Sequence, residues 1–262
     1  MLPAPIRGLR ASFVFLTRLP IGGFPYTSED FRWAAAHAPL VGYVVGGITA
    51  LAFWIFRPLG DLSAAGIAVA ISVLVTGGFH EDGLADTADA LGGGYTKERV
   101  LEILKDSRVG AFGAAALVLS LGLRVTLLAR LGEQALWALP LVGAAARVGP
   151  IALIAAMPYV TDQKHQKSGD LSRAGWVQAL ISVLWLALGL GLALGFGTLS
   201  LARAGALLLT LIGITALTGY RYQRRMGGVT GDFLGATEQL GEIAALATFA
   251  WSVKAYGAGI GH

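Results

Sequence analysis

The chain has 262 residues, of which 55% are hydrophobic and only 14% are Asp, Glu, Lys or Arg. Soluble domains carry about 25% charged residues, so this composition excludes an ordinary soluble protein and predicts a polytopic membrane protein. The sequence contains no cysteine, which excludes disulfides and thiolate metal sites. The net charge of +4 is spread over loops, so we expect membrane lipid and no nucleic acid as a partner.

The predicted elements, taken in chain order, begin with residues 7–20, which are too short to cross a bilayer and suit an N-terminal interfacial or re-entrant helix. Seven later stretches reach or approach the ~20 apolar residues that a span needs. They are residues 40–56, 64–79, 111–131, 135–157, 176–196, 199–220 and 241–256. A polar segment, 92–108, with a helix predicted at 97–105, separates the second and third. The sequence therefore predicts one membrane domain, 1–262, folded as an all-α bundle of about seven transmembrane spans.

The orientation follows from the distribution of Lys and Arg, which favour cytoplasmic loops. With the N-terminus inside, 14 of the 20 basic residues fall on the cytoplasmic side and four on the other. The same arrangement puts every motif-rich loop on the cytoplasmic face. We therefore expect a multi-pass protein of the bacterial cytoplasmic (inner) membrane, with its active site facing the cytoplasm. The oligomeric state stays open, a homo-oligomer included.

Four of the 16 acidic residues lie within nine positions, directly after the second predicted span: Glu81, Asp82, Asp86 and Asp89. On a helix the three Asp residues share one face, at i, i+4 and i+7. Two carboxylates about 6 Å apart repel by roughly 3 kcal/mol at an effective dielectric constant near 20, and a divalent cation removes that cost. Oxygen-only ligands suit Mg²⁺. All four residues are therefore candidate magnesium ligands, the alternative being a solvated acidic helix face.

Two further polar segments are predicted on the same side of the membrane. Lys105 and Arg108 precede the third span, where they either hold phosphate or simply flank the span as cytoplasmic charges. A glycine-rich turn with Thr230 and Gly231 opens a helix, and its backbone N–H groups suit an anion. The alternative there is a loop with helix caps.

Four more side chains are candidates for the same site. Asp232 and Glu238 follow the glycine-rich turn and would add metal or hydroxyl contacts. Arg147 is a charge within an apolar stretch, either facing a cavity and binding phosphate or snorkelling to the membrane surface. His80 precedes the acidic residues as a candidate general base, although a structural histidine is the alternative.

Four segments in this order resemble the cobalamin synthase family, the adenosylcobinamide-GDP ribazoletransferases. They are FLTRLP at 15–20, GFHEDGLADTADA at 78–90, KDSRVGAFG at 105–113 and GGVTGDFLGA at 227–236. The second is the most specific, whereas the apolar spans between the motifs add little.

The resemblance implies a Mg²⁺-dependent transferase of late cobalamin biosynthesis that joins adenosylcobinamide-GDP to α-ribazole or its 5′-phosphate and releases GMP. A ribose hydroxyl would attack the pyrophosphate, and carboxylate-held metal with Lys and Arg would stabilise the phosphoryl charge. Asp82 and His80 are the catalytic candidates for taking the hydroxyl proton, and the residues do not decide between them.

Two rival classes remain. An intramembrane prenyltransferase or a CDP-alcohol phosphotransferase also uses Asp-rich helices, but the spacing here lacks their usual second Asp-rich repeat. An ion-coupled transporter would place carboxylates at mid-membrane and show repeat symmetry between its halves; the sequence shows neither feature.

Overall fold

The computed structural model describes residues 2–23, 25–160 and 174–251. Within these ranges the chain is all-α, as predicted, and extended backbone pairs at a single isolated bridge between Tyr159 and Val229. The first five helices are α1 (Ala4–Leu16), α2 (Ser28–Phe56), α3 (Asp61–Thr76), α4 (Phe79–Gly93) and α5 (Lys97–Ile103). They are followed by α6 (Ala111–Leu131), α7 (Ala135–Ala146), α8 (Val148–Ala156), α9 (Trp176–Gly195), α10 (Leu201–Met226) and α11 (Gly231–Trp251). Short 3₁₀ turns, Arg57–Leu59 and Gly132–Gln134, follow α2 and α6.

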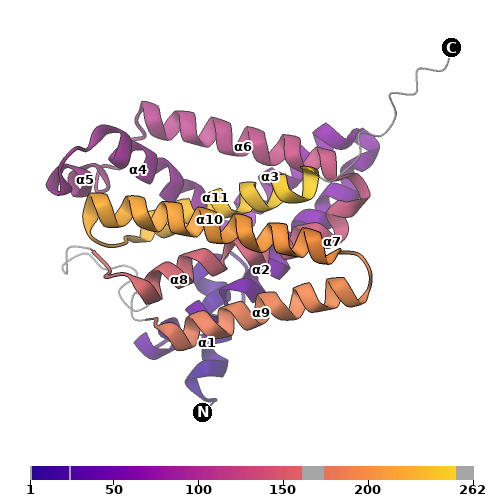
Figure 1. Ribbon diagram of the computed structural model, residues 1–262, viewed down its shortest axis with the longest axis horizontal. Coiled ribbons are helices and arrows are strands. Elements are labelled where there is room, and N and C mark those ends of the chain that lie inside the picture. The colour runs from indigo at the N-terminus through magenta and orange to yellow at the C-terminus, as the bar shows by residue number, and fades with distance from the viewer. Residues whose placement is uncertain (1, 24, 161–173, 252–262) are drawn as a thin grey trace.

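Two helices organise the bundle. Helix α2 packs against α1, α3, α7 and α9, and α11 packs against α4, α6, α7 and α10. The axes of α6, α9 and α10 lie roughly parallel to one another, and α4, α5 and the turn between α10 and α11 gather at one end (Figure 1). The polar motifs predicted from sequence therefore lie at a common end of the molecule.

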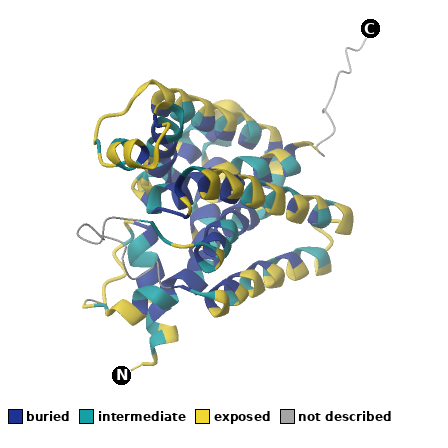
Figure 2. Cartoon of the chain, turned by 60° about the vertical axis from the view of Figure 1, so that its left-hand side comes forward, coloured by how far each residue is buried: buried dark blue, intermediate teal, exposed yellow. Residues whose placement is uncertain are grey.

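The outer faces of several helices carry exposed apolar side chains, whose contact with water would be unfavourable. Buried residues line the interior, while the outward faces of the long helices are exposed (Figure 2). On α9, the exposed residues include Leu180, Leu184, Leu188 and Leu192. Because contiguous apolar surface of this kind is normally covered, these faces suit lipid.

The number of membrane spans is not confirmed. Among the described residues, the stretches that are long and apolar enough to cross a membrane are Ser28–Leu59, Ala111–Ala156, Trp176–Gly195 and Leu201–Met226. The pair α3 and α4 would make a fifth, although it bends by 91° at its break. Transmembrane helices are thus supported, whereas the count of seven stays a prediction. The last predicted span, 241–256, runs beyond the described residues, which end at Trp251.

One helix begins earlier than the sequence indicated: α2 starts at Ser28, ahead of the predicted span 40–56. Thr27 accepts a hydrogen bond from the Asp30 backbone N–H, and the Asp30 carboxylate accepts one from Thr27 in return, which is a capping box. Helix α11 begins at Gly231, where the glycine-rich turn was predicted to open a helix, and residues 241–251 of the predicted last span are its later part.

The predicted span 135–157 is two helices, α7 and α8, which meet at Arg147. Pro150 explains the break: it has no N–H to donate to the carbonyl of Ala146, and its ring crowds that carbonyl. The Arg147 N–H instead bonds the Ala144 carbonyl at 3.3 Å.

The turn between α3 and α4 consists of Gly77 and Gly78, with φ of 70° and 68°. Two successive left-handed residues are accessible to glycine at little cost. This turn directs α4 across the end of the bundle, so the acidic helix does not continue along α3.

Candidate active site

A cavity of about 260 Å³ lies at the end of the bundle where α1, α2, α4, α8 and α11 meet. Much of its wall is apolar, including Phe15, Leu16, Ile151 and Ile154. The ionisable residues in the wall are His80, Asp82, Arg147, Asp232 and Glu238. An apolar pocket with a few convergent polar groups is the usual form of a small-molecule site. These five residues and Gly231, all predicted from sequence, line this one.

Glycines allow the two acidic helices to approach closely. A Cβ placed on Gly83 of α4 would lie 2.9 Å from the Asp232 carbonyl oxygen and 3.2 Å from the Gly235 Cα atom on α11. Only a residue without a side chain permits that approach, as in other tightly packed membrane helices. The crossing brings the polar residues at the start of α11 beside those of α4.

The glycine-rich turn before α11 is held by backbone contacts and a helix cap. The Val160 N–H bonds the Val229 carbonyl at 2.7 Å, and the Val229 N–H bonds the Pro158 carbonyl at 2.9 Å. Thr230 Oγ1 then accepts a hydrogen bond from the Phe233 N–H at 3.3 Å, so Thr230 caps α11. Thr230 is buried, and Gly231 lies in the cavity wall.

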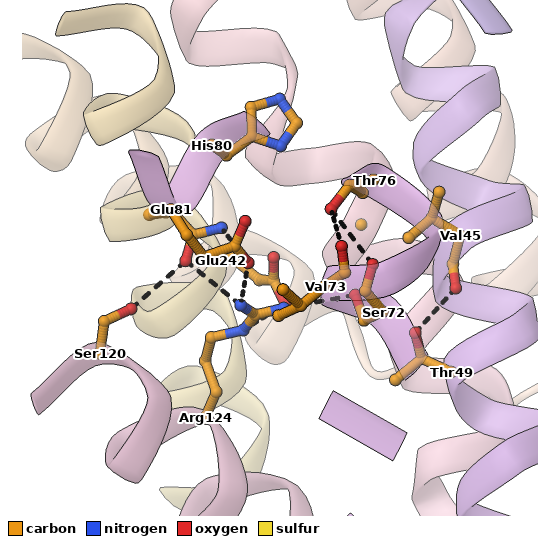
Figure 3. A network of polar contacts seen from close by, with 12 residues as sticks. Val45, Thr49, Ser72, Val73, Thr76, His80, Glu81, Ser120, Arg124 and Glu242 are labelled. Carbon is orange, nitrogen blue, oxygen red and sulfur yellow. Dashed lines mark hydrogen bonds and ion pairs between the residues drawn. The ribbon is translucent and has the colours of Figure 1, made fainter. Parts of the chain in front are cut away.

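Arg124 of α6 binds a buried cluster of acidic and polar side chains (Figure 3). Its guanidinium is 2% exposed and lies 2.6 Å from Glu81 Oε1 and 3.0 Å from Glu242 Oε1. It also contacts Gln239 Oε1 and Ser72 Oγ, each at 3.3 Å. Glu81 is therefore engaged in an ion pair that ties α4 to α6 and α11.

Glu238 forms a second buried ion pair. Its Oε1 lies 3.1 Å from Arg147 Nη1, and its Oε2 lies 3.5 Å from His80 Nδ1. The Gln239 side-chain N–H donates to Glu238 Oε2 at 3.1 Å, which links the two ion pairs. We call Glu81, Glu238 and Glu242 the paired carboxylates.

Asp82, Asp86 and Asp232 differ from them, because in the described parts of the chain they form no ion pair with Lys, Arg or His. We call them the unpaired carboxylates. Asp86 instead experiences the negative charges of Asp82, Asp232 and Asp89. Asp232 lies in the first turn of α11, outside the candidate spans. Burial and the negative charge of Asp82 together raise the pKa of Asp232 to about 6, although a hydrogen bond from its own backbone N–H acts in the opposite direction.

No three His, Asp or Glu side chains of the described residues are already arranged as a group that could hold a metal ion. The chemistry of the unpaired carboxylates nevertheless fits Mg²⁺, since they offer oxygen donors only and their mutual repulsion would fall on binding a cation. They come from α4 and α11, two helices that cross closely at Gly83.

Asp89, the fourth acidic residue predicted as a metal ligand, contacts backbone. Its carboxylate accepts hydrogen bonds from the Gly110 N–H at 2.7 Å and the Gly113 N–H at 2.9 Å. These N–H groups lie at the start of α6, where intrahelical partners are lacking and an anion is favoured. Asp89 therefore anchors the start of α6 to α4.

The two basic residues before α6 do not line the cavity, in contrast to Arg147. Arg108 is exposed, and its Nε and Nη2 bind the Asp106 carboxylate at 3.0 and 2.6 Å. The hydrogen bond from Arg108 lowers the pKa of Asp106 to about 2. Lys105 is also exposed. Both residues occupy the loop that leads into α6, beside the Asp89 contact.

Arg124, Glu242 and Gln239 were not among the site residues predicted from sequence. The signal was present, since an arginine within an apolar helix normally has a buried partner. Glu238 and Glu242 are four residues apart and thus share a face of α11.

The family model described as cobalamin-5-phosphate synthase matches residues 8–250. Relatives named adenosylcobinamide-GDP ribazoletransferase include one from Leptothrix cholodnii, 43% identical over 88% of this chain and 90% of its own. Another, from Bradyrhizobium diazoefficiens, is 41% identical over 92% of each chain. A third, from Polaromonas sp., is 40% identical over 88% of this chain and 91% of its own. No solved structure matches the chain.

The helical bundle with lipid-compatible outer faces, and the charged cavity at its end, define a membrane protein with a buried small-molecule site. The chain belongs to the cobalamin-5-phosphate synthase family.

Proposed function

We propose that this protein is an adenosylcobinamide-GDP ribazoletransferase, which joins adenosylcobinamide-GDP to α-ribazole or α-ribazole 5′-phosphate and releases GMP. The observation that carries the proposal is the match to relatives of that name along most of the chain. The site supports it, because a phosphoryl transfer needs clustered carboxylates and an arginine beside a substrate cavity.

In this proposal Asp82, Asp86 and Asp232 hold Mg²⁺. The ion would stabilise negative charge on the phosphoryl oxygens. This set differs from the one expected from sequence, since Glu81 pairs with Arg124 and Asp89 binds the start of α6. Asp82 and His80 both lie in the cavity wall and are the proposed acceptors of the ribose hydroxyl proton.

The pyrophosphate of adenosylcobinamide-GDP is proposed to meet the N-terminus of α11 at Thr230 and Gly231, with Arg147 nearby in the wall. Lys105 and Arg108 would extend the phosphate site outward. The guanidinium of Arg108 must then release the Asp106 carboxylate and bind phosphate instead. Phosphate can accept the same two parallel N–H hydrogen bonds as the carboxylate.

One assay tests the function. Purified protein in detergent, given adenosylcobinamide-GDP, α-ribazole 5′-phosphate and Mg²⁺, is expected to release GMP. No GMP should form when either substrate or the metal is left out. Absence of GMP with all components present, from protein that unfolds cooperatively, would contradict the proposal.

We also propose that the cavity end of the bundle faces the cytoplasm across the inner membrane, as the basic residues indicate. The native chain has no cysteine, so any labelling by a thiol reagent comes from a single introduced cysteine. Thr96→Cys, at the cavity end, should react with an impermeant thiol reagent only from inside, and Thr198→Cys, between α9 and α10, only from outside. The reverse pattern in intact cells would overturn this orientation.

A further inference from the structure

Arg225, the penultimate residue of α10, holds the far end of the acidic helix α4. Its Nη2 donates hydrogen bonds to the carbonyls of Leu91 and Gly94, at 2.8 and 2.6 Å. The last carbonyls of a helix lack intrahelical partners and carry partial negative charge, so a cation beside them is favourable. Arg225 therefore caps the C-terminal end of α4 from a different helix.

This contact joins two elements that are far apart in the sequence. Leu91 lies 134 residues before Arg225, and α10 itself packs mainly against α11 and α8. The end of α4 and the turn between α10 and α11 gather at the same end of the molecule (Figure 1). One side chain thus connects α4 to the segment that leads into α11.

The segment that follows Arg225 is short and held by hydrogen bonds. Gly227 ends α10 in the left-handed conformation, with a φ of 72°. Val229 is bonded through both its backbone N–H and its carbonyl, and Thr230 caps α11. Asp232 follows in the first turn of that helix. A displacement of Arg225 relative to α4 would therefore move Asp232 relative to the carboxylates of α4.

The unpaired carboxylates come from the two elements that Arg225 connects. Asp82 and Asp86 belong to α4, whereas Asp232 belongs to α11. The close approach at Gly83 sets the spacing of the two helices at that point, and Arg225 holds α4 further along its length. Two separated contacts fix the angle between the helices as well as their spacing.

We propose that Arg225 is a positioning residue for the magnesium site, because it keeps the carboxylates of α4 at the distance from Asp232 that a single cation requires. The inference rests on the proposed function and adds a residue that acts through α4 and not by contact with the metal. Replacing residues that orient metal ligands typically lowers metal affinity or activity by roughly 10–100-fold.

The bonding of Arg225 differs from that of an arginine that mainly stabilises the fold. Its Nε is buried and has no hydrogen-bond partner among the described residues. An unbonded buried N–H is unfavourable and offsets part of the gain from the two carbonyl contacts. Arg124, in contrast, donates through Nε, Nη1 and Nη2. We therefore expect the loss of Arg225 to change stability much less than the loss of Arg124.

The first test removes the hydrogen-bond donors and keeps most of the side-chain bulk. Arg225→Met retains an unbranched stem that can pack in the same space but binds neither carbonyl. With both substrates saturating, we expect the Mg²⁺ concentration for half-maximal GMP release to rise roughly tenfold. KM for each substrate should stay close to wild type. The rise in melting temperature on adding Mg²⁺ should be smaller in this variant, because weaker binding stabilises the folded state less.

Three further variants separate positioning from a general effect of charge. Arg225→Lys should recover most of the Mg²⁺ affinity, because a single nitrogen, Nη2, makes both carbonyl contacts. Arg224→Met is the matched control: it removes the same charge from the preceding residue, whose guanidinium lies over the Tyr220 ring of its own helix. It should leave the Mg²⁺ requirement unchanged. Arg225→Gln, too short to reach both carbonyls, takes the place of Arg225→Met if the methionine variant does not fold.

A second measurement reports the position of α4 without substrate or metal. The native chain has no cysteine, so spin labels can be attached at Tyr95→Cys, just after α4, and at Leu240→Cys, on the exposed side of α11. Electron paramagnetic resonance should give a narrow distribution of label-to-label distances with Arg225 present and a broader one in Arg225→Met. Arg224→Met should give the narrow distribution.

Three results would overturn the inference. A wild-type Mg²⁺ requirement in Arg225→Met beside a lower melting temperature would make Arg225 a helix cap alone. An unchanged distance distribution would show that α4 keeps its position without Arg225, and an equal loss of Mg²⁺ affinity in Arg224→Met would indicate a general charge effect. The distance measurement needs no turnover, so a wild-type protein that releases no GMP would contradict the proposed function and still leave the role of Arg225 tested.

Discussion

The paired and the unpaired carboxylates are chemically alike and close together, yet their surroundings differ. Glu81 and Asp82 are consecutive residues of α4; Glu81 is buried against Arg124, whereas Asp82 is exposed and lies in the cavity wall. A helix turns by about 100° per residue, so neighbours point in different directions. The paired carboxylates hold three helices together, and the unpaired ones keep their oxygens available for a ligand.

Removing Arg124 should have the largest effect on stability, because Arg124 is the counter-charge of two carboxylates. Arg124→Leu leaves the buried Glu81 and the partly buried Glu242 without a counter-charge. Breaking a buried ion pair in this way costs about 3–5 kcal/mol, and we expect a large fall in melting temperature in detergent. Combining the change with Glu81→Gln and Glu242→Gln should restore much of the stability. An unchanged melting temperature for Arg124→Leu alone would show that the cluster contributes nothing.

The unpaired carboxylates should behave in the opposite way. Asp82→Asn and Asp86→Asn each remove one charge from a repelling group, so stability without Mg²⁺ should stay equal or rise. Turnover should fall about 100-fold or more, equivalent to about 2.7 kcal/mol of transition-state stabilisation. Added Mg²⁺ should raise the melting temperature of wild type more than that of either variant. Lower stability with turnover per folded molecule unchanged would reverse the assignment.

Asp89 tests the distinction between structural carboxylates and metal-binding carboxylates. If its main role is to anchor α6, Asp89→Ala should lower stability by about 1–2 kcal/mol, as for a lost helix cap. Turnover per folded molecule and the Mg²⁺ concentration for half-maximal activity should stay close to wild type. A loss of activity as large as that of Asp82→Asn would return Asp89 to the metal ligands.

Arg108 should give the smallest effect on stability. It is exposed, and within the described residues its ion-pair partner is its near neighbour Asp106, so Arg108→Ala should leave the melting temperature unchanged. If the residue contacts phosphate, KM for adenosylcobinamide-GDP should rise roughly tenfold while KM for α-ribazole stays constant. An unchanged KM for both substrates would leave Arg108 as a flanking charge, and Arg99→Ala on the nearby α5 serves as the control.

The helices and the position of the site were predictable, because apolar stretches, glycine turns and an acidic i, i+4, i+7 pattern are local signals. The roles of individual carboxylates were not. The partner of Glu81 is 43 residues away, and Asp89 meets backbone 21 and 24 residues further on. No local pattern distinguishes Glu81 from Asp82, since only the packing of α6 and α11 decides which one is buried.

The cavity itself was also beyond sequence reasoning. Ser12 and Phe15 belong to the N-terminal segment predicted as an interfacial or re-entrant helix, and the sequence did not indicate that α1 packs against α2 and completes the cavity wall. The signal was weak, because Gly8, Ala11 and Ser12 are small residues and do not form an apolar stripe. Their size permits close packing on α2, where a Cβ on Gly8 would lie 2.9 Å from the Trp33 carbonyl carbon.

The close crossing of Gly83 and Gly235 also orders events during biosynthesis. The two residues are in the first and last thirds of the chain, and α11 is the final helix among the described residues. Ribosomes add about 5–20 residues per second, so α4 is made several seconds before α11. If Asp232 belongs to the site as proposed, the site is incomplete during that interval, and activity requires α11 to dock against α4.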